Sequence, residues 1–272
     1  MTSYGFVQQA LAFLNQHQGN ITSTLELKCQ KDKPHEYPPR ALPTALLLSL
    51  VDKELYCPKE YTSQVVLDND RNMKAGGWAD SPDTKLEIVG ERTTFIDGGK
   101  RMSVADAAAK GVLKLTHDRY CLAISTGITG RGLLGLWGPN QAADAIVTKI
   151  DETDGKKRLM VAVQNRASGH VAFPGGMVDD KEHVSRTVRR EFFEEQAKED
   201  PLVAGMFDKG GTVVYRGFVD DERNTDNAWM ETTAIHFHAS KDIADSIVFE
   251  VSDPEEGTYH PRWELTAADR NS

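Results

Sequence analysis

Residues 176–195 read GMVDDKEHVSRTVRREFFEE, a run in which an apolar helix face turns acidic. At the α-helical step of about 100° per residue, an apolar stripe runs from Val184 to Phe192. Glu191 and Glu195 fall inside or beside that stripe, as like charges four residues apart near the end of the predicted helix. Both this pairing and the helix dipole disfavour anions there. A divalent cation is the simplest explanation, because it neutralises converging carboxylates, and hard cations such as Mg²⁺ take oxygen ligands.

The segment before this helix predicts two strands followed by a glycine turn. Residues 159–163 and 170–173 are short apolar runs rich in branched side chains, which is typical of strands. Residues 174–176 read Pro-Gly-Gly, and the two glycines allow a tight turn and a close approach of backbone oxygens to a ligand or metal. Asp179 or Asp180 is expected to cap the helix.

The alternative is that these charges form a solvated, salt-bridged face, as most charge runs on helices do. The spacing favours a functional site instead. Gly, five residues, Glu, seven residues, Arg-Glu, an apolar residue, any residue and Glu-Glu is a pattern that resembles the signature of the Nudix hydrolases. The matching residues are Gly176, Glu182, Arg190, Glu191, Phe192, Glu194 and Glu195. The pattern departs at Ala197 and Lys198, where a glycine and an apolar residue are usual, and neither position would carry a metal.

Two further stretches narrow the resemblance. Residues 130–144 and 215–232, together with 173–179, are similar to the mitochondrial-type ADP-ribose pyrophosphatases of animals. They are equally similar to the cytosolic C-terminal domain of ADP-ribose-gated melastatin TRP channels. The resemblance is firm from about Gly130 to Trp263. It implies an α+β fold, an α/β/α sandwich around a mixed sheet, with a smaller N-terminal α+β domain.

The resemblance also implies a reaction and a metal site. The reaction is hydrolysis of the small molecule ADP-ribose to AMP and ribose 5-phosphate with Mg²⁺, for which Mn²⁺ is a possible substitute. Glu191 and Glu195 would be the principal metal ligands and catalytic groups, and Glu194 would assist them. A backbone carbonyl near Gly175 or Gly176 would complete the metal shell.

Two box residues have an implied structural role, since Arg190 and Glu182 would pair to hold the helix. In vertebrate melastatin channels the box has lost its glutamates and the domain senses without cutting. Here the run 190–195 is intact, which favours an active enzyme. The alternatives are an ADP-ribose-sensing domain within a larger channel chain, and an enzyme for another nucleoside diphosphate derivative.

The general base is expected in the polar loop 220–227, between predicted strands at 212–219 and 229–237. Asp226 is the first candidate, followed by Asp220 or Asp221, and Glu231 is a weaker one. Turn capping, a common role of Asp, is the alternative for each of them.

Candidate substrate contacts lie in the same region. Arg223 could clamp a phosphate or a ribose hydroxyl, because a guanidinium binds phosphate in a bidentate manner, and Asp221 is a further candidate. Phe173, Trp229 and Trp137 could stack on the adenine. A surface ion pair for the arginine and core positions for the aromatic residues are the alternatives, since large aromatic residues are mostly buried.

The length and charge of the whole chain limit its domain number and the other possible classes of function. Its 272 residues suit two domains, and we expect a boundary near residue 125, with an N-terminal domain over 1–125 at the rim of the cleft and the Nudix domain over 126–272. Residues 103–110 predict a short helix capped by Ser103. The net charge is −9, from 41 acidic and 32 basic residues, and no basic stripe is present, which argues against nucleic acid.

The cysteines and the apolar runs bear on the compartment. Cys29, Cys57 and Cys121 are widely spaced and odd in number, which favours reduced thiols. A cytoplasmic location is therefore expected, with the mitochondrial matrix as the alternative, although the first arginine is Arg40. Residues 46–51 are too short an apolar run to span a bilayer, so no direct membrane contact is expected. The eight histidines show no metal-ligand spacing.

Overall fold

The computed structural model describes residues 34–39, 58–123, 125–153, 155–165, 171–179, 182–250 and 260–266. These residues form two compact units. One contains the described parts of 142–216 and 232–272, and the other contains those of 19–141 and 217–231. The division differs from a single boundary near residue 125, because residues 217–231 group with the N-terminal part of the chain. Predictions that involve Cys29, Cys57 and residues 46–51 lie outside the described residues.

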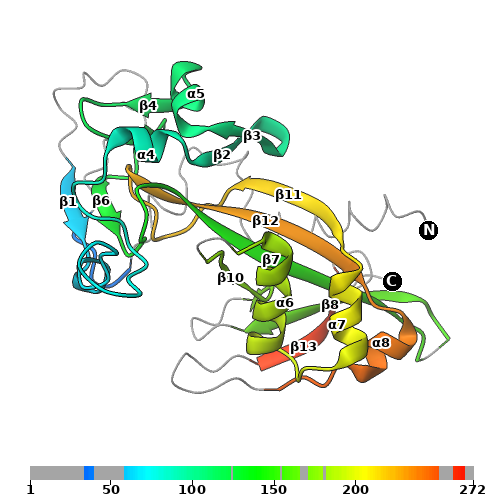
Figure 1. The fold of residues 1–272 in the computed structure, drawn as a ribbon. Helices are drawn as coiled ribbons and strands as arrows, with labels where there is room; N and C mark the ends of the chain where they lie inside the picture. Colours follow the sequence, from blue (N-terminus) through cyan, green and yellow to red (C-terminus); the bar gives the residue numbers. More distant parts are fainter. Residues whose placement is uncertain are drawn as a thin grey trace. The chain divides into compact units, whose positions relative to one another are not determined.

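The first unit is built on a sheet with the strand order β11-β12-β7-β8-β13, to which β10 adds beside β7 and β9 beside β8 (Figure 1). The strands are β7 (Gly138–Asp151), β8 (Arg158–Asn165), β9 (Val171–Ala172), β10 (Gly175–Met177), β11 (Thr212–Phe218), β12 (Ala228–His238) and β13 (His260–Leu265). Strands β7 and β8, β8 and β13, and β10 and β7 pair antiparallel.

The sheet is mixed, as predicted. Asp144 on β7 contacts Thr232 on β12, and Thr148 on β7 contacts His236 on β12, so both strands advance in the same direction and run parallel. The predicted strands at 212–219 and 229–237 correspond to β11 and β12. The α+β architecture with a mixed sheet, expected from the sequence, is therefore confirmed.

Alternating residues of the central strands bury both faces of this sheet. One face packs against α6 (Val184–Glu195) and α7 (Pro201–Asp208), and α8 (Lys241–Ser246) follows β12. Its core includes Ala143, Ala145, Val147, Ala162, Val188, Phe192, Phe207 and Phe237. The opposite face carries a smaller cluster of Ile146, Val161, Val163, Phe173 and Ala234. The apolar stripe predicted on the helix is thus the side that α6 presents to the core.

The cap of α6 differs from the prediction. The His183 side chain accepts a hydrogen bond from the backbone N–H of Ser185, and His183 is the residue that precedes the helix. The predicted cap at Asp179 is wrong because the chain makes a further turn before the helix begins, in which Glu182 N donates to Asp179 O. Asp180 lies outside the described residues.

The second unit combines three small sheets with short helices. The sheets pair β1 (Lys59–Thr62) with β6 (Ile128–Gly132), β2 (Thr93–Ile96) with β3 (Lys100–Ser103), and β4 (Leu113–Leu115) with β5 (Tyr120–Leu122). The helices are α3 (Gln64–Leu67), α4 (Leu86–Gly90), the 3₁₀ turn η3 (Asp97–Gly99) and α5 (Val104–Ala109). The prediction of a helix capped by Ser103 is confirmed, since the Ser103 hydroxyl accepts from Asp106 N. Trp137 and Trp229 lie in the core of this unit.

A buried ion-pair network stabilises the second unit. Asp80, which is 2% exposed, accepts two hydrogen bonds from the Arg92 guanidinium at 2.6 and 2.7 Å and one from Trp137 N at 2.8 Å. Arg131 is fully buried and donates to the backbone oxygens of Asp80 and Gly135. The network therefore fixes the segment around residue 80 to the turn that precedes β7.

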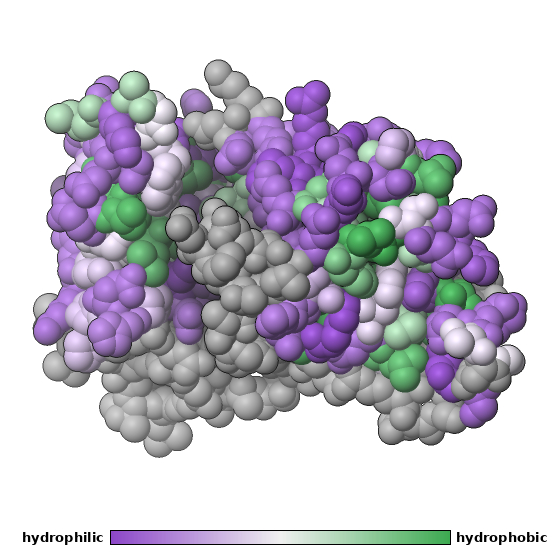
Figure 2. Space-filling model, turned by 90° about the horizontal axis from the view of Figure 1, so that it is seen from below, coloured by the Kyte–Doolittle hydropathy of each residue, from purple (hydrophilic) through white to green (hydrophobic). Residues whose placement is uncertain are grey.

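The described surface is mainly polar. From the side drawn in Figure 2, hydrophilic residues dominate the coloured surface and apolar residues are scattered among them. Exposed apolar side chains include Met73, Trp78 and Val248. None of the helices in the described segments is both long enough and apolar enough to cross a membrane.

Candidate functional site around the glycine turn

Residues 174–176, called the glycine turn here, form a bend at Pro174 followed by strand β10, so the two glycines lie in a strand and not in the predicted tight turn. Helix α6 brings Glu195 to these glycines. The Gly175 backbone N–H donates to Glu195 Oε2 at 2.9 Å, and Gln164 Nε2 donates to the same oxygen at 2.8 Å. Glu195 is thus held beside the two glycines, although it lies twenty residues further along the chain.

Glu191 occupies the other side of this turn. A Cβ added at Gly176 would lie 2.6 Å from Glu191 Oε2 and closer still to Oε1, so only glycine leaves room for the carboxylate. Glu191 is 8% exposed. Burial raises the pKa of Glu191 to about 7, with the charge of Glu195 adding to the effect and that of Arg190 opposing it. The site therefore holds a carboxylate whose charge is costly unless a cation compensates it.

Arg190 ties this part of α6 to the segment that precedes it. Its Nε and Nη2 donate to the two oxygens of Glu182 at 3.3 and 3.1 Å, which is the pairing expected from the sequence. Its Nη1 donates to Glu191 Oε1 at 2.8 Å and to Glu194 Oε2 at 3.0 Å. The hydrogen bonds from Arg190 lower the pKa of Glu182. Glu194 is exposed and lies on the outer side of the helix, with Arg190 as its partner.

The carboxylate oxygens of Glu191 and Glu195 are donors that suit a hard divalent cation. Among the described residues, no group of three or more His, Cys, Asp and Glu side chains is placed to hold a metal ion. Glu191 and Glu195 nevertheless lie at the same glycine turn, and the missing side chain at Gly176 leaves the space for a carboxylate. Mg²⁺ is usually bound through one or two carboxylates and otherwise keeps its waters or takes substrate phosphates. The ligation roles of Glu191, Glu194, Glu195 and Gly176 stay predictions.

The polar loop 220–227, called the acidic loop below, lies in the second unit. Arg223 Nε and Nη2 donate to the two oxygens of Asp221 at 2.7 and 2.8 Å, so a phosphate bound by Arg223 would have to exchange with Asp221. Asp226 is buried, and its Oδ1 accepts from Thr126 N at 2.6 Å and from Thr126 Oγ1 at 2.8 Å. These contacts supply a structural role for Asp226, which is compatible with the turn-capping alternative; its role as a base stays a prediction.

The aromatic candidates occupy core positions. Trp229 is 1% exposed, and its Nε1 donates to the buried carboxylate of Glu231 at 2.9 Å. Phe173 is buried in the smaller cluster of the sheet, and Trp137 in the core of the second unit. These positions agree with the alternative expected for large aromatic residues, and the stacking of Phe173 or Trp229 on adenine stays a prediction. Burial raises the pKa of Glu231, while its four donors oppose that effect.

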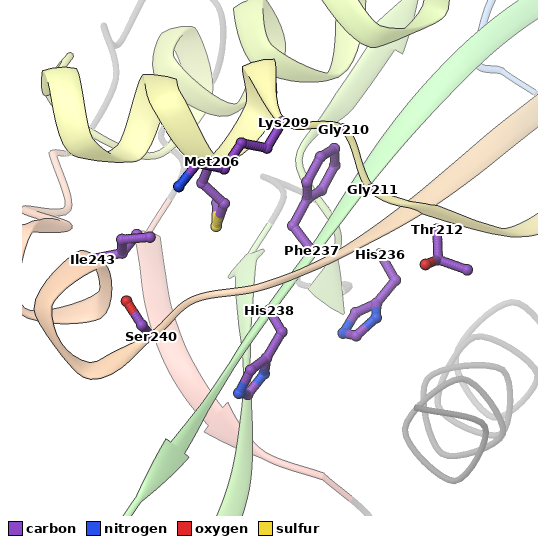
Figure 3. Close-up of a pocket in the computed structure, with 10 residues that line it drawn as sticks. All are labelled: Met206, Lys209, Gly210, Gly211, Thr212, His236, Phe237, His238, Ser240 and Ile243. Carbon is purple, nitrogen blue, oxygen red and sulfur yellow. The ribbon is translucent and has the colours of Figure 1, made fainter. Parts of the chain in front are cut away.

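A pocket of about 750 Å³ lies elsewhere in the first unit, between the end of α7, the start of β11 and the end of β12 (Figure 3). Figure 3 shows the His236 and His238 rings pointing to the opposite side of β12 from Phe237. The Thr148 hydroxyl lies 2.8 Å from His236 Nε2 and 3.0 Å from His238 Nδ1. Burial, reinforced by His238, lowers the pKa of His236 to about 4. No residue predicted for the site lines this pocket.

One acidic residue near the turn was missed from the sequence. Asp144 on β7 lies opposite Gly175 in the β10–β7 pair, and a Cβ at Gly175 would overlap Asp144 Oδ1. The signal that could have pointed to it is a charged residue within an otherwise apolar strand run, since Ala145, Ile146 and Val147 follow it. The strand pairing that brings it to Gly175 cannot be read from that run.

Comparison with known proteins agrees with this arrangement. Residues 140–270 match the NUDIX domain. The chain is 49% identical over 131 residues to putative nudix hydrolase 6 of Caenorhabditis elegans, which covers 47% of this chain and 49% of that protein. It is 37% identical over 229 residues to the mitochondrial ADP-ribose pyrophosphatase of Rattus norvegicus, covering 75% and 62% respectively.

A third relative is a channel, the transient receptor potential cation channel subfamily M member-like 2 of Nematostella vectensis, with 41% identity over 147 residues. That match covers 47% of this chain and 10% of the channel. The chain thus spans half to three-fifths of the two shorter relatives and a small part of the channel. The fold, the box residues at the glycine turn and these matches together show that the chain contains a Nudix domain, homologous to mitochondrial ADP-ribose pyrophosphatase and to the Nudix-like region of melastatin channels.

Proposed function

We propose that this chain is a Mg²⁺-dependent Nudix hydrolase that cleaves the pyrophosphate bond of ADP-ribose to AMP and ribose 5-phosphate, with Mn²⁺ able to replace Mg²⁺. The observation that carries the proposal is the placement of Glu191 and Glu195 against the Gly175–Gly176 turn. Support for the substrate comes from the identity to a rat ADP-ribose pyrophosphatase. Nudix proteins typically use divalent metal ions, and the oxygen donors of this turn suit Mg²⁺ or Mn²⁺.

The chemistry required is attack of a water oxygen on phosphorus, with cleavage of the bridging P–O bond. A cation held by Glu191 and Glu195 would supply charge neutralisation for an anionic substrate that the net charge of −9 otherwise repels. Arg190, through Glu182 and the Met177 carbonyl, keeps α6 in place against the turn. Rigid placement of this kind contributes to catalysis because most of the acceleration in phosphoryl transfer comes from positioning and electrostatics.

The water must also lose a proton. Asp226 is the base that we propose, and two hydrogen bonds from Thr126 hold its carboxylate in place. Asp220 and Asp221 are the alternatives; Asp221 is already paired with Arg223.

A second candidate function is ADP-ribose sensing without turnover, as part of a melastatin-type channel. The 41% identity to the Nematostella channel favours it. The two functions separate in one measurement, because a sensor binds ADP-ribose without releasing AMP.

The decisive experiment is product analysis with Glu195→Gln. The purified chain is incubated with ADP-ribose and Mg²⁺, and AMP is quantified. We expect Glu195→Gln to lower the turnover by roughly two to four decades, because a carboxylate that holds the cation is lost. Glu199→Gln is the matched control: Glu199 is exposed and pairs with Arg189, so its turnover should stay close to that of the parent chain.

Three results would contradict the proposal. If Glu195→Gln turned over ADP-ribose as fast as the parent chain, Glu195 would not be a ligand of the catalytic cation. Binding of ADP-ribose with no AMP released by the parent chain would favour the sensor. Cleavage of nucleotide sugars, NADH or diadenosine polyphosphates in place of ADP-ribose would show that the substrate is a different nucleoside diphosphate derivative.

A further inference from the structure

We infer that Asp144 is a third acidic side chain of the glycine-turn site, and that it acts as a positioning residue for the hydrated cation, oriented by Thr232. The inference rests on the proposed function. Its starting point is the register of β10 with β7, in which Gly175 lies opposite Asp144. A Cβ at Gly175 would overlap Asp144 Oδ1, so the carboxylate lies directly against this residue.

Gly175 therefore has carboxylates on two sides. Glu195 Oε2 accepts from its backbone N–H at 2.9 Å, and Asp144 Oδ1 lies against its Cα. The two carboxylates come from different elements, α6 and β7, and meet at one residue of β10. Carboxylate oxygens are the ligands and water acceptors that a hard divalent cation prefers. The turn thus brings together more negative charge than the Nudix box alone provides.

Thr232 holds Asp144 in this orientation. Its hydroxyl donates to Asp144 Oδ2 at 2.6 Å, and Thr232 itself is buried on the parallel neighbour β12. A donor at Oδ2 fixes the carboxylate plane and directs Oδ1 towards Gly175. Partners of this kind, which orient a group that acts on a metal, commonly change metal affinity or activity by about 10- to 100-fold when they are removed.

A separate observation at the same place indicates a ligand with hydrogen-bond donors. Gln164 is fully buried, and its Nε2 is directed at Glu195 Oε2 at 2.8 Å. That contact fixes which end of the carboxamide is the oxygen, since two oxygens would repel each other. Gln164 Oε1 then has no hydrogen-bond partner among the described residues. Buried acceptors are rarely left unpaired, and the waters that Mg²⁺ retains are suitable donors.

Together, Asp144 Oδ1 and Gln164 Oε1 provide two acceptors beside Glu195 for cation-bound water. Asp144 would act through those waters, which is consistent with the lack of a direct three-carboxylate cluster in the described segments. A residue with this role should affect cation affinity in the absence of substrate, whereas its effect on the fold should be small.

The test measures Mn²⁺ binding to the substrate-free chain by the electron paramagnetic resonance signal of free Mn²⁺. We expect Asp144→Asn to raise the Kd for Mn²⁺ by about 10-fold, and Thr232→Val to raise it by a smaller factor because the charge is kept. Thr233→Val is the matched control, a neighbouring buried threonine on the opposite face of β12, and it should leave the Kd unchanged. Water-proton relaxation by the bound Mn²⁺ should change in Asp144→Asn and stay constant in the control.

Glu195→Gln is measured in parallel so that the two ideas fail separately. If Glu195→Gln weakens Mn²⁺ binding and Asp144→Asn does not, the inference about Asp144 is overturned and the proposed function stands. If neither variant changes the Kd, both are overturned. Should Asp144→Asn not fold, Thr232→Val decides alone, and an unchanged Kd and relaxation signal in that variant would overturn the inference.

Discussion

Gly176 shows how the absence of a side chain creates the site. The Glu191 carboxylate fills the volume that a Cβ at this position would need. An added Cβ would lie 2.4 Å from Glu191 Cδ and 2.6 Å from Oε2, which is too close for any side chain. Gly205 in α7 is the contrasting case, since a Cβ there would meet nothing within 4 Å. The two glycines therefore predict opposite outcomes for the same substitution.

We expect Gly176→Ala to destabilise the chain by about 1–3 kcal/mol, because the overlap displaces Glu191 or the turn. Gly205→Ala should stabilise it by about 0.5–1 kcal/mol, since alanine in a helix costs less conformational entropy than glycine. Urea unfolding of both variants, with Mn²⁺ titration of each folded protein, measures the difference. Equal stability and equal Mn²⁺ affinity in Gly176→Ala would show that Glu191 does not need this space.

Helix α6 carries two adjacent arginines with different functions. Arg190 contacts Glu182, Glu191 and Glu194 and also the Met177 carbonyl of β10 at 3.2 Å. Arg189 pairs with two exposed carboxylates, Asp208 at 3.0 Å and Glu199 at 3.2 Å. Only the first of these networks links the helix to the glycine turn.

Arg190→Lys should therefore be costly and Arg189→Lys nearly neutral. A lysine cannot form the fork that binds both oxygens of Glu182, so we expect Arg190→Lys to lose about 1–2 kcal/mol of stability and to lower turnover. Arg189→Lys keeps a charge on a surface pair and should change stability by less than about 0.5 kcal/mol. Chemical denaturation and turnover of the two variants provide the measurement, and similar losses in both would contradict this division of roles.

Periodicity predicted several elements well, including α5 with its Ser103 cap, the strands that became β11 and β12, and the buried stripe of α6. These features depend on local spacing. The contacts between Asp226 and Thr126 and between Asp144 and Thr232 join residues 100 and 88 positions apart. Strand pairing determines them, so a single sequence could not reveal them. The hydrogen bond from Trp229 to the buried carboxylate of Glu231 likewise depends on tertiary packing.

The two compact units are not consecutive in the chain. Residues 217–231, with the acidic loop and Trp229, group with the N-terminal part, whereas the box helix and the glycine turn belong to the other unit. A boundary search by composition looks for one cut and cannot find a segment that returns to an earlier unit. The stability of the second unit therefore matters for residues on both sides of the Nudix box.

A substitution at Asp80 would test how much its buried ion pair stabilises the second unit. Asp80→Asn removes the charge that faces Arg92 inside the unit, and we expect a loss of about 3 kcal/mol, because breaking a buried ion pair leaves the partner charge uncompensated. Hydrogen exchange should accelerate in residues 58–123. Asp83→Asn, at an exposed position nearby, should stay within about 0.5 kcal/mol of the parent chain. A loss confined to the Nudix box, with residues 58–123 unaffected, would argue against this network.

The register of β10 has an evolutionary consequence. Gly175, Gly176 and Met177 lie opposite Asp144, Ala143 and Ala142, and successive strand residues face opposite sides. Deleting one residue between Phe173 and Gly176 would bring the bulky Met177 into the space of the Glu191 carboxylate and shift the pairing of β10 with β7 by one residue. Insertions and deletions in this short strand should therefore be purged from descendants of this gene, as should any side chain at Gly175 or Gly176.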